Sequence, residues 1–400
     1  NILMGLRILQ ICPRIPYPLH DGGAIGVFNI TKHVAQRGHT IRMVTFDKSE
    51  SSPPRELTRW CSVRTVNAYT GHSIVKLISS QWRSIPYMQT KYRHEKFADA
   101  IREEVTLFKP DVVHVDHLVM AQYGLLVKTE FGIPIVLREH NLETKFLKRL
   151  AENDSSIMLR YFARRDVLKM ASDEAKTCSL FDRVVMISRE DESGLKELAP
   201  DAKTRVIPAG VTIPDLPSTM QGTQGHSILF LGALDWKPNV DALRWFCREV
   251  FPEILEQVPN ADLLVVGKGK LGKAVDIDNP PVKLLGFVED LTHVIANADV
   301  CIVPLLTGSG IRIKILELLA AGKAVVSTKI GAEGIEVESG KEILISDRPG
   351  DFARDVIELL RNPELRSRLG ACGRTTMVQK YGWPAIAEAF ETVYRDVCRG

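Results

Sequence analysis

The chain has 400 residues, of which 45% are hydrophobic and 25% charged, and its formal net charge is +3 at pH 7. These values are typical of a globular protein with two or three domains, and the small charge gives no reason to expect nucleic-acid binding. No apolar run approaches the roughly 20 residues of a membrane-spanning helix, and the seven cysteines are scattered without a Cys-x-x-Cys pair. We therefore expect a cytoplasmic protein with reduced thiols, and peripheral association with a membrane stays open.

The first half of the chain alternates strands and helices. A strand over residues 6–12 leads into a Pro-rich loop, the pair Gly22-Gly23, a helix over 24–37 that stops at Gly38, and a strand over 39–45. Further strands are predicted at 111–117, 133–138, 183–188 and 205–208. This βαβ order implies a parallel sheet.

A Pro- and Gly-containing linker over 213–226 separates residues 1–212 from a second series over 227–383. The second series contains predicted strands at 228–231, 261–266, 282–285, 300–304 and 324–328, and predicted helices at 239–255 and 311–321. An amphipathic helix over 384–400 ends the chain. We predict an α/β fold of two Rossmann-like domains, whose parallel sheets present their carboxyl ends to one interdomain cleft.

The segment with the most candidate ligand-binding residues follows the predicted strand over 300–304. Gly308, Ser309 and Gly310 form a turn whose backbone N–H groups can approach an anion closely, and Ile311 opens the next helix. Arg312 and Lys314 add positive charge to its first turn, while the Glu317 carboxylate can accept hydrogen bonds from sugar hydroxyls. This pattern predicts a site for a diphosphate joined to a ribose.

The same segment resembles the signature of the family 4 retaining glycosyltransferases of GT-B fold, of the bacterial polysaccharide or glycoconjugate type. That family carries two Glu residues eight positions apart, and here the second is Glu317 while Ser309 stands at the first. The resemblance implies that Glu317 binds the ribose of the donor, and it leaves the sugar contact at Ser309 open. Residues 308–317 are most similar to a sub-branch reading Gly-Ser-Gly-Ile-Arg-x-Lys-x-Leu-Glu.

Other positions of the second domain resemble the family less closely. Many members have Arg where this chain has Ala233, so Arg312 and Lys314 would replace a missing cation. Lys237 is a further candidate cation, with an ordinary solvated lysine as the alternative. Phe287 and Val288 resemble a pocket that reads the nucleobase, with a core role for Phe287 as the alternative.

In the first domain, Gly22 and Gly23 resemble the loop that closes over the donor phosphate, or form an ordinary turn. The strand ending His-Val-Asp-His places Asp116 where the family commonly has a His at the reacting sugar, with His117 one position further. Asp116 is therefore a candidate catalytic group, and the alternative is that it braces a neighbouring histidine.

A second polar segment follows the strand over 133–138 and resembles an acceptor-side pattern of this branch. It contains Arg138, His140, Asn141 and Glu143, and the alternative is a hydrogen-bonded structural network.

The resemblance implies transfer of a sugar, with retention, from a UDP- or GDP-sugar to a hydroxyl of a glycan or lipid-linked acceptor, in polysaccharide or glycolipid biosynthesis. It implies a hexosyltransferase that needs no cofactor and no metal, and a last helix over 384–400 that packs back on the first domain. Two rivals stay open: a GT-B sugar-nucleotide epimerase, and a non-catalytic nucleotide-binding partner subunit.

Overall fold

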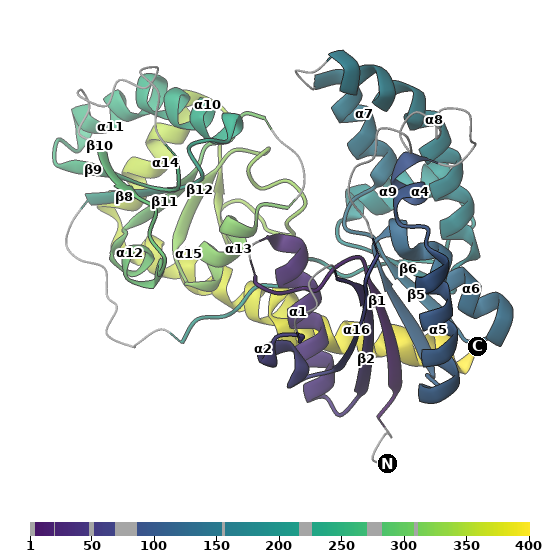
Figure 1. Ribbon diagram of the computed structural model, residues 1–400. Helices are drawn as coiled ribbons and strands as arrows, with labels where there is room; N and C mark the ends of the chain where they lie inside the picture. Colours follow the sequence, from purple (N-terminus) through teal and green to yellow (C-terminus); the bar gives the residue numbers. More distant parts are fainter. Residues whose placement is uncertain are drawn as a thin grey trace. The chain divides into compact units, whose positions relative to one another are not determined.

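The computed structural model describes residues 5–19, 21–47, 52–68, 86–153, 157–215, 226–269, 282–307 and 311–400. These form two compact units, one made of residues 1–210 and 386–400 and the other of residues 211–385. Each unit contains one parallel sheet with helices packed around it, so the predicted α/β class with two Rossmann-like domains is confirmed (Figure 1).

The first unit is built on a seven-stranded sheet in the order β3-β2-β1-β4-β5-β6-β7. Its strands are β1 (Arg7–Cys12), β2 (Thr40–Phe46), β3 (Ser62–Val66), β4 (Val112–Asp116), β5 (Ile135–Arg138), β6 (Arg183–Met186) and β7 (Thr204–Val206). The helices include α1 (Gly22–Gln36), α2 (Arg55–Thr58), α4 (Tyr87–Lys91), α5 (Glu95–Phe108), α6 (Ala121–Phe131), α7 (Glu143–Asn153), α8 (Ile157–Leu180) and α9 (Arg189–Leu198), with a 3-10 turn at Leu118–Met120.

Side chains alternate between the two faces of this sheet, and the two faces differ in chemistry. Leu9 of β1 and Val115 of β4 lie in the apolar core that α5 and α6 cover. The opposite face carries Gln10, His114 and Asp116 in buried positions. Helix α1, through Thr31, and helix α16 (Trp383–Arg399), through Tyr394, contribute side chains to that second face.

Helix α1 begins two residues before the predicted Ala24, so Gly22 and Gly23, which were predicted as a loop or turn, are its first residues. The Asp21 side chain accepts a hydrogen bond from the Ala24 N–H and so caps the first turn. At the other end Gly38 has a φ of 91°, a left-handed conformation that suits glycine, and the predicted stop at Gly38 is confirmed.

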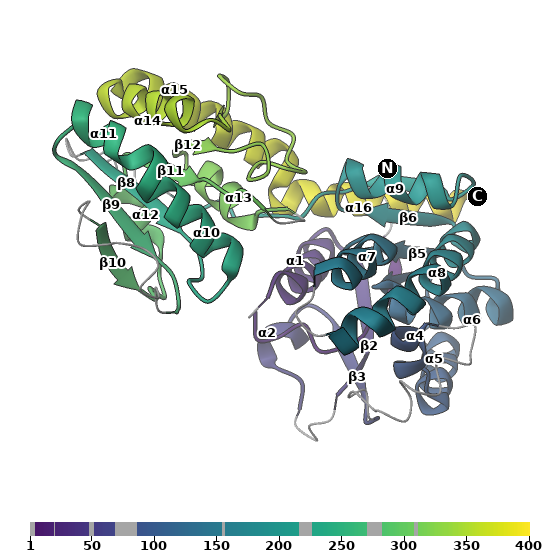
Figure 2. The same ribbon diagram turned by 90° about the horizontal axis from the view of Figure 1, so that it is seen from above.

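The second unit has a six-stranded sheet in the order β10-β9-β8-β11-β12-β13. Its strands are β8 (His226–Leu231), β9 (Ala261–Val266), β10 (Val282–Gly286), β11 (Val300–Val303), β12 (Ala324–Ser327) and β13 (Leu344–Ile345). Its helices include α10 (Lys237–Trp245), α11 (Phe251–Gln257), α12 (Thr292–Asn297), α13 (Ile313–Ala320), α14 (Pro349–Arg361) and α15 (Pro363–Thr376). Helices α14 and α15 lie beside β12, as Figure 2 shows.

Two predicted helices of this unit differ in detail from the structure. The helix predicted over 239–255 is divided by a π turn at Phe246–Val250, and Pro252, which has no N–H to donate, stands at the start of α11. The helix predicted over 311–321 begins at Ile313, because Arg312 has a non-helical ψ of 89° and occupies the N-cap position. Ile311 and Arg312 therefore precede the helix.

Candidate functional site

Strands β1, β4 and β5 bring a group of polar residues together in the first unit. The parallel register pairs Gln10 with His114 and Asp116 with Arg138. His114 and Asp116 are two positions apart on one strand, so their side chains share a face. We call the resulting group of Gln10, His114, Asp116, Arg138 and His140 the Asp116 centre.

Asp116 lies fully buried at the middle of this group, with 0% of its surface exposed. Its Oδ2 accepts a hydrogen bond from Gln10 Nε2 at 2.8 Å. Its Oδ1 lies 3.3 Å from both His114 Nε2 and Arg138 Nη1 and 3.6 Å from His140 Nε2. Burial alone would raise the pKa of Asp116, but His114, His140 and the Arg138 cation hold it well below its ordinary value. The carboxylate is therefore ionised, and its oxygens are already engaged by protein groups.

His140 of the Asp116 centre stacks on a neighbouring histidine, His117. His117 and His140 stack with 3.6 Å between ring centroids and an interplanar angle of 13°. Burial, with the nearby Arg138 charge, lowers the pKa of His140 to about 4, and burial also lowers the pKa of His117 well below its ordinary value. Both rings are therefore neutral at neutral pH. His117 has a φ of 73°, a backbone conformation that costs energy in a residue with a side chain and that recurs at functional sites.

Arg138 is held tightly against α1. Its Nη1 lies 2.8 Å from His140 Nε2, and a Cβ placed on Gly26 of α1 would lie 2.9 Å from its Nη2. Glycine at position 26 therefore leaves the room that the guanidinium occupies. Gly22 and Gly23 are the first residues of α1, and a Cβ on Gly23 would lie 3.9 Å from His140 Nδ1. The structure thus brings the first residues of α1 near His140 of the predicted acceptor-side segment.

Three carboxyl groups, those of Glu139, Glu143 and Glu174, lie within or beside the predicted acceptor-side segment. Glu174 of α8 accepts hydrogen bonds from the backbone N–H groups of Glu143 and Thr144, at 2.7 and 3.0 Å, and so caps the start of α7. Burial, followed by the Glu174 charge, raises the pKa of Glu143 to about 7. Burial also raises the pKa of Glu139 well above its ordinary value; its Oε1 accepts a 3.6 Å hydrogen bond from the Cys178 thiol. Asn141, by contrast, is exposed.

The second unit holds a half-buried cation in the first turn of α13. Lys314 Nζ donates hydrogen bonds to the Leu231 carbonyl oxygen at 2.9 Å and to Asn239 Oδ1 at 3.1 Å. Burial, and then the charge of Arg312, lowers the pKa of Lys314 to about 8. Lys314 Nζ also lies 5.2 Å from the centroid of the Phe230 ring. Arg312 is itself buried, with 6% of its surface exposed.

Glu317 lies one turn further along α13. Its side chain reaches the surface, yet it is surrounded by enough protein that desolvation raises its pKa. Ile311 is half-buried just before the helix. Gly308, Ser309 and Gly310, the predicted phosphate-binding turn, lie outside the described residues.

The remaining predicted residues of the second unit are more exposed. Lys237 forms an ion pair with Asp241 one turn along α10, and its side chain is 83% exposed. Phe287 is 72% exposed, so the alternative of a core role for it is not supported. Val288 is partly buried against the core. None of these three contacts Lys314 or Glu317 in the hydrogen bonds and ion pairs found among the described residues.

The sequence did not indicate every member of the Asp116 centre. Gln10 is one missed residue, although a lone polar side chain within an apolar strand was a signal. Thr31 of α1 donates to Gln10 Oε1 at 2.7 Å and was also missed. The Tyr394 hydroxyl of α16 lies 2.6 Å from His114 Nδ1. Because Tyr394 stands on the apolar face of its helix, the sequence gave no sign of this polar contact. Glu174, in the middle of a long helix, gave none either.

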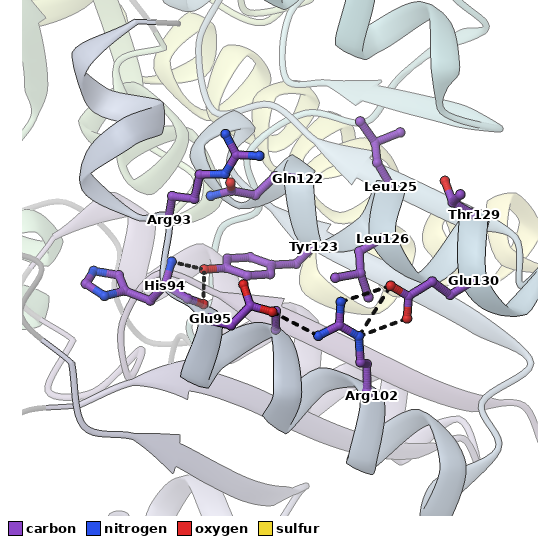
Figure 3. Close-up of a pocket in the computed structure, with 11 residues that line it drawn as sticks. Arg93, His94, Glu95, Arg102, Gln122, Tyr123, Leu125, Leu126, Thr129 and Glu130 are labelled. Atoms are coloured by element: carbon purple, nitrogen blue, oxygen red, sulfur yellow. Dashed lines mark hydrogen bonds and ion pairs between the residues drawn. The ribbon is translucent and has the colours of Figure 1, made fainter.

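A separate pocket of about 400 Å³ lies in the first unit, where α5 and α6 cover the face of the sheet opposite to Asp116. Within it Arg102 pairs with Glu95 and Glu130, and the Tyr123 hydroxyl accepts a hydrogen bond from the His94 N–H (Figure 3). None of the predicted site residues lines this pocket.

Two features are absent from the described ranges. Those ranges contain no helix that is long and apolar enough to cross a membrane. They also contain no group of three His, Cys, Asp or Glu side chains arranged to hold a metal ion.

Two family models match the chain. Residues 20–213 match the model described as Glycosyltransferase Family 4, and residues 225–362 match the model described as Glycosyl transferases group 1. Among relatives, an uncharacterized 44.6 kDa protein in the cps region of Klebsiella pneumoniae is 23% identical, over 89% of this chain and 91% of that protein. The phosphatidyl-myo-inositol mannosyltransferase of Mycobacterium tuberculosis is 30% identical, over 48% of this chain and 53% of that protein.

Solved structures resemble the whole chain. A sucrose-phosphate synthase from Thermosynechococcus elongatus has a TM-score of 0.66 at 19% identity, with 98% of this chain and 99% of that one covered. HepE of Anabaena, solved with UDP and glucose, has a TM-score of 0.59 at 15% identity, with coverage of 98% and 99%. The fold of this chain is therefore that of the GT-B glycosyltransferases, and the two family matches support glycosyltransferase as its enzyme class.

Proposed function

We propose that this protein is a retaining glycosyltransferase that moves a sugar from a UDP- or GDP-sugar to an acceptor hydroxyl. The acceptor is a glycan or a lipid-linked glycan, and the pathway is polysaccharide or glycolipid biosynthesis at the cytoplasmic side. Retention, the hexosyl donor and the pathway rest on the family 4 resemblance of residues 308–317. The match to a phosphatidyl-myo-inositol mannosyltransferase supports an acceptor that carries a lipid.

The observation that carries the proposal is the group of charges at the start of α13. Arg312 and Lys314 lie close enough for the charge of one to lower the pKa of the other, and Glu317 follows one turn later. Two adjacent cations at a helix N-terminus favour a dianionic ligand, and a diphosphate would in turn stabilise the charged form of Lys314. Solved GT-B neighbours contain UDP or UDP-glucose, which supports a nucleotide ligand.

The first unit supplies the acceptor side in this proposal. Asp116 is too deeply buried to accept a proton from an acceptor hydroxyl, so we assign it the role of orienting Arg138 and His140. His140, Asn141 and Glu143 would then contact the acceptor, and Glu143 has a pKa near neutrality that suits the exchange of a proton. This refines the sequence-based hypothesis, in which Asp116 itself met the acceptor.

Catalysis would be largely electrostatic. As the glycosidic bond breaks, negative charge grows on the departing diphosphate, and Arg312, Lys314 and the N–H groups at the start of α13 would stabilise it. These groups would do so without a metal ion. The epimerase alternative requires paired acid and base carboxyls in contact with the sugar, and both Asp116 and Glu139 have 0% of their surface exposed.

Titration calorimetry with UDP, GDP and their sugars tests the donor site. We expect the wild-type protein to bind one nucleotide family, and Glu317→Ala to weaken that binding by about 1.5–3 kcal/mol, the value for a hydrogen bond to a charged group. Glu338→Ala is a matched control, since Glu338 is an exposed carboxylate of the same unit. Equal affinity of the wild type and Glu317→Ala would reject the role of Glu317 in holding the ribose.

A further inference from the structure

We infer that Tyr394, on the last helix of the chain, is a positioning residue of the Asp116 centre, acting through His114. This inference rests on the proposed function, because it assigns a role in organising the acceptor side. It deepens that function by adding a residue that neither the family matches nor the sequence pattern indicates. Tyr394, His114 and Asp116 form one buried chain of polar contacts.

The chain begins at the Tyr394 hydroxyl, which lies 2.6 Å from His114 Nδ1. The other ring nitrogen of His114, Nε2, lies 3.3 Å from Asp116 Oδ1. Tyr394 and His114 are each 1% exposed and Asp116 is 0% exposed, so bulk water does not compete for these groups. Phe390 packs beside the His114 ring with 5.4 Å between centroids, which restricts tilting of the imidazole.

The chemistry of the partners indicates which group donates at each contact, although the 3.3 Å approach of His114 Nε2 to Asp116 Oδ1 is an electrostatic contact and not a well-aligned hydrogen bond. Asp116 is ionised and can only accept, which favours the His114 tautomer that carries its hydrogen on Nε2, the nitrogen facing Asp116. In neutral imidazole Nδ1 is then the acceptor, and the Tyr394 O–H donates to it. Burial raises the pKa of Tyr394 well above its ordinary value, so the phenol keeps the proton that it donates. In the imidazolium form Nδ1 would also be a donor, and Tyr394 would need another acceptor; the described residues show no other hydrogen bond from its hydroxyl.

Through His114, Tyr394 influences the position of Asp116, which it does not contact directly. By holding His114 in one tautomer, Tyr394 keeps an N–H directed at Asp116 Oδ1. The same oxygen lies 3.3 Å from Arg138 Nη1, and Arg138 Nη1 lies 2.8 Å from His140 Nε2. A second brace comes from α1, where Thr31 donates to Gln10 Oε1 and Gln10 donates to Asp116 Oδ2. Helices α16 and α1 thus hold the two carboxylate oxygens from separate directions.

The primary test measures the tautomer of His114 and needs no substrate. In protein labelled with ¹⁵N-histidine, the His114 signals are assigned as those lost in His114→Gln among the 10 histidines of the chain. We expect a pure Nε2–H tautomer in the wild type and a mixture in Tyr394→Phe. A wild-type His114 that carries its hydrogen on Nδ1, or a tautomer unchanged in Tyr394→Phe, would overturn the inference.

The second readout is turnover of the nucleotide sugar that calorimetry identifies. Tyr394→Phe should lower kcat about fivefold, the factor for one ordinary internal hydrogen bond, and leave the KM for the donor unchanged. Unchanged turnover together with an altered tautomer would reject the positioning role. Since the tautomer is measured on the protein alone, its result stays informative even if no donor is turned over, and the two proposals fail separately.

The matched control is Tyr123→Phe in the same unit. Tyr123 is 3% exposed, and its hydroxyl donates to the Tyr92 carbonyl at 2.7 Å, so the substitution removes an equally buried hydroxyl hydrogen bond. It lies on the opposite side of the sheet from Asp116. We expect Tyr123→Phe to lower the melting temperature as Tyr394→Phe does, with the His114 tautomer and turnover unchanged. An equal loss of turnover in both variants would show that Tyr394 matters only for stability.

Discussion

Asp116 is a buried carboxylate that its neighbours keep in the charged form. Moving a carboxylate out of water is costly, and here the Arg138 guanidinium and the Gln10 amide donate hydrogen bonds to Asp116, while His114 Nε2 lies 3.3 Å from it. A group held in this way is poorly suited to exchange protons during a reaction. It is well suited to fix the position of an arginine and a histidine at a surface.

Asp116→Asn tests this role. The amide keeps the shape of the carboxylate but leaves the buried Arg138 without its anion, so we expect a loss of about 3 kcal/mol in the free energy of unfolding. Sugar transfer should fall as well, whereas nucleotide binding, which we assign to the second unit, should be unchanged. Denaturant unfolding and calorimetry on one preparation measure both effects.

The control for this variant is Asp111→Asn. Asp111 stands at the other end of β4 and accepts a hydrogen bond from the exposed Arg7 N–H at 2.7 Å. The control should have a much smaller effect on stability and none on transfer. If Asp116→Asn were as stable as the wild type, Asp116 would not be the charged anchor that we describe.

Glu143 makes the stability of the protein depend on pH in a defined window. Its pKa rises from 4.5 to about 7 on folding, so between these values the folded state holds a proton that the unfolded state has lost. The contribution of Glu143 to stability therefore falls as pH rises from about 4.5 to 7, by at most about 3.5 kcal/mol at about 1.4 kcal/mol per pKa unit. Glu143→Gln should remove much of this decrease and be more stable than the wild type at pH 8. Denaturant unfolding of the wild type and of Glu143→Gln at pH 5 and pH 8 measures this difference. An equal pH dependence of stability in the two proteins would contradict the raised pKa of Glu143.

At the scale of elements, the site depends on where helices meet the ends of strands. Helix α1 leaves room for Arg138 at Gly26, α8 caps α7 through Glu174, and α16 reaches His114 through Tyr394. Each contact joins residues from different elements. These helices therefore act as supports for side chains that the strands and loops present.

Gly26→Ala tests the closest of these supports. In an ordinary helix this substitution stabilises by about 0.4–1 kcal/mol, but here the new Cβ would lie 2.9 Å from Arg138 Nη2. We expect a net loss of about 1–2 kcal/mol through overpacking, and a larger relative loss of sugar transfer as the guanidinium is displaced. Gly350→Ala in α14, where the nearest atom would lie at 3.7 Å, should instead be neutral or stabilising. Full activity of Gly26→Ala would show that Arg138 tolerates displacement.

Elements were predicted from sequence more successfully than contacts between elements. Apolar runs bounded by Gly and Pro identified β1, β4, β8, β9 and β11, because buried parallel strands are continuously apolar. The short strands β3 and β13 carry no such run and were not predicted. Arg138 and His140 were predicted because polar residues directly after a buried strand are unusual. Tyr394 and Glu174 were not, because their partners lie 280 and 31 positions away in the sequence.

At the scale of the whole molecule, the two units have different chemistry. The second unit collects cations at the start of α13, which suits an anionic donor. The first unit collects neutral imidazoles and a carboxyl group of raised pKa, which suits a hydroxyl-bearing acceptor. The two family models divide the chain in the same way, at residues 20–213 and 225–362. This division agrees with an enzyme that joins two different substrates.

The most direct test of this account is turnover of nucleotide sugars by the purified protein. A panel of UDP- and GDP-hexoses is incubated with the protein in excess EDTA, with and without a glycan or lipid-linked acceptor. Nucleoside diphosphate release is measured, and the anomeric configuration of the product is determined by NMR. We predict that one donor is consumed without added metal and that the product keeps the configuration of the donor. Absence of turnover with every donor, or a product of inverted configuration, would contradict the proposed retaining glycosyltransferase.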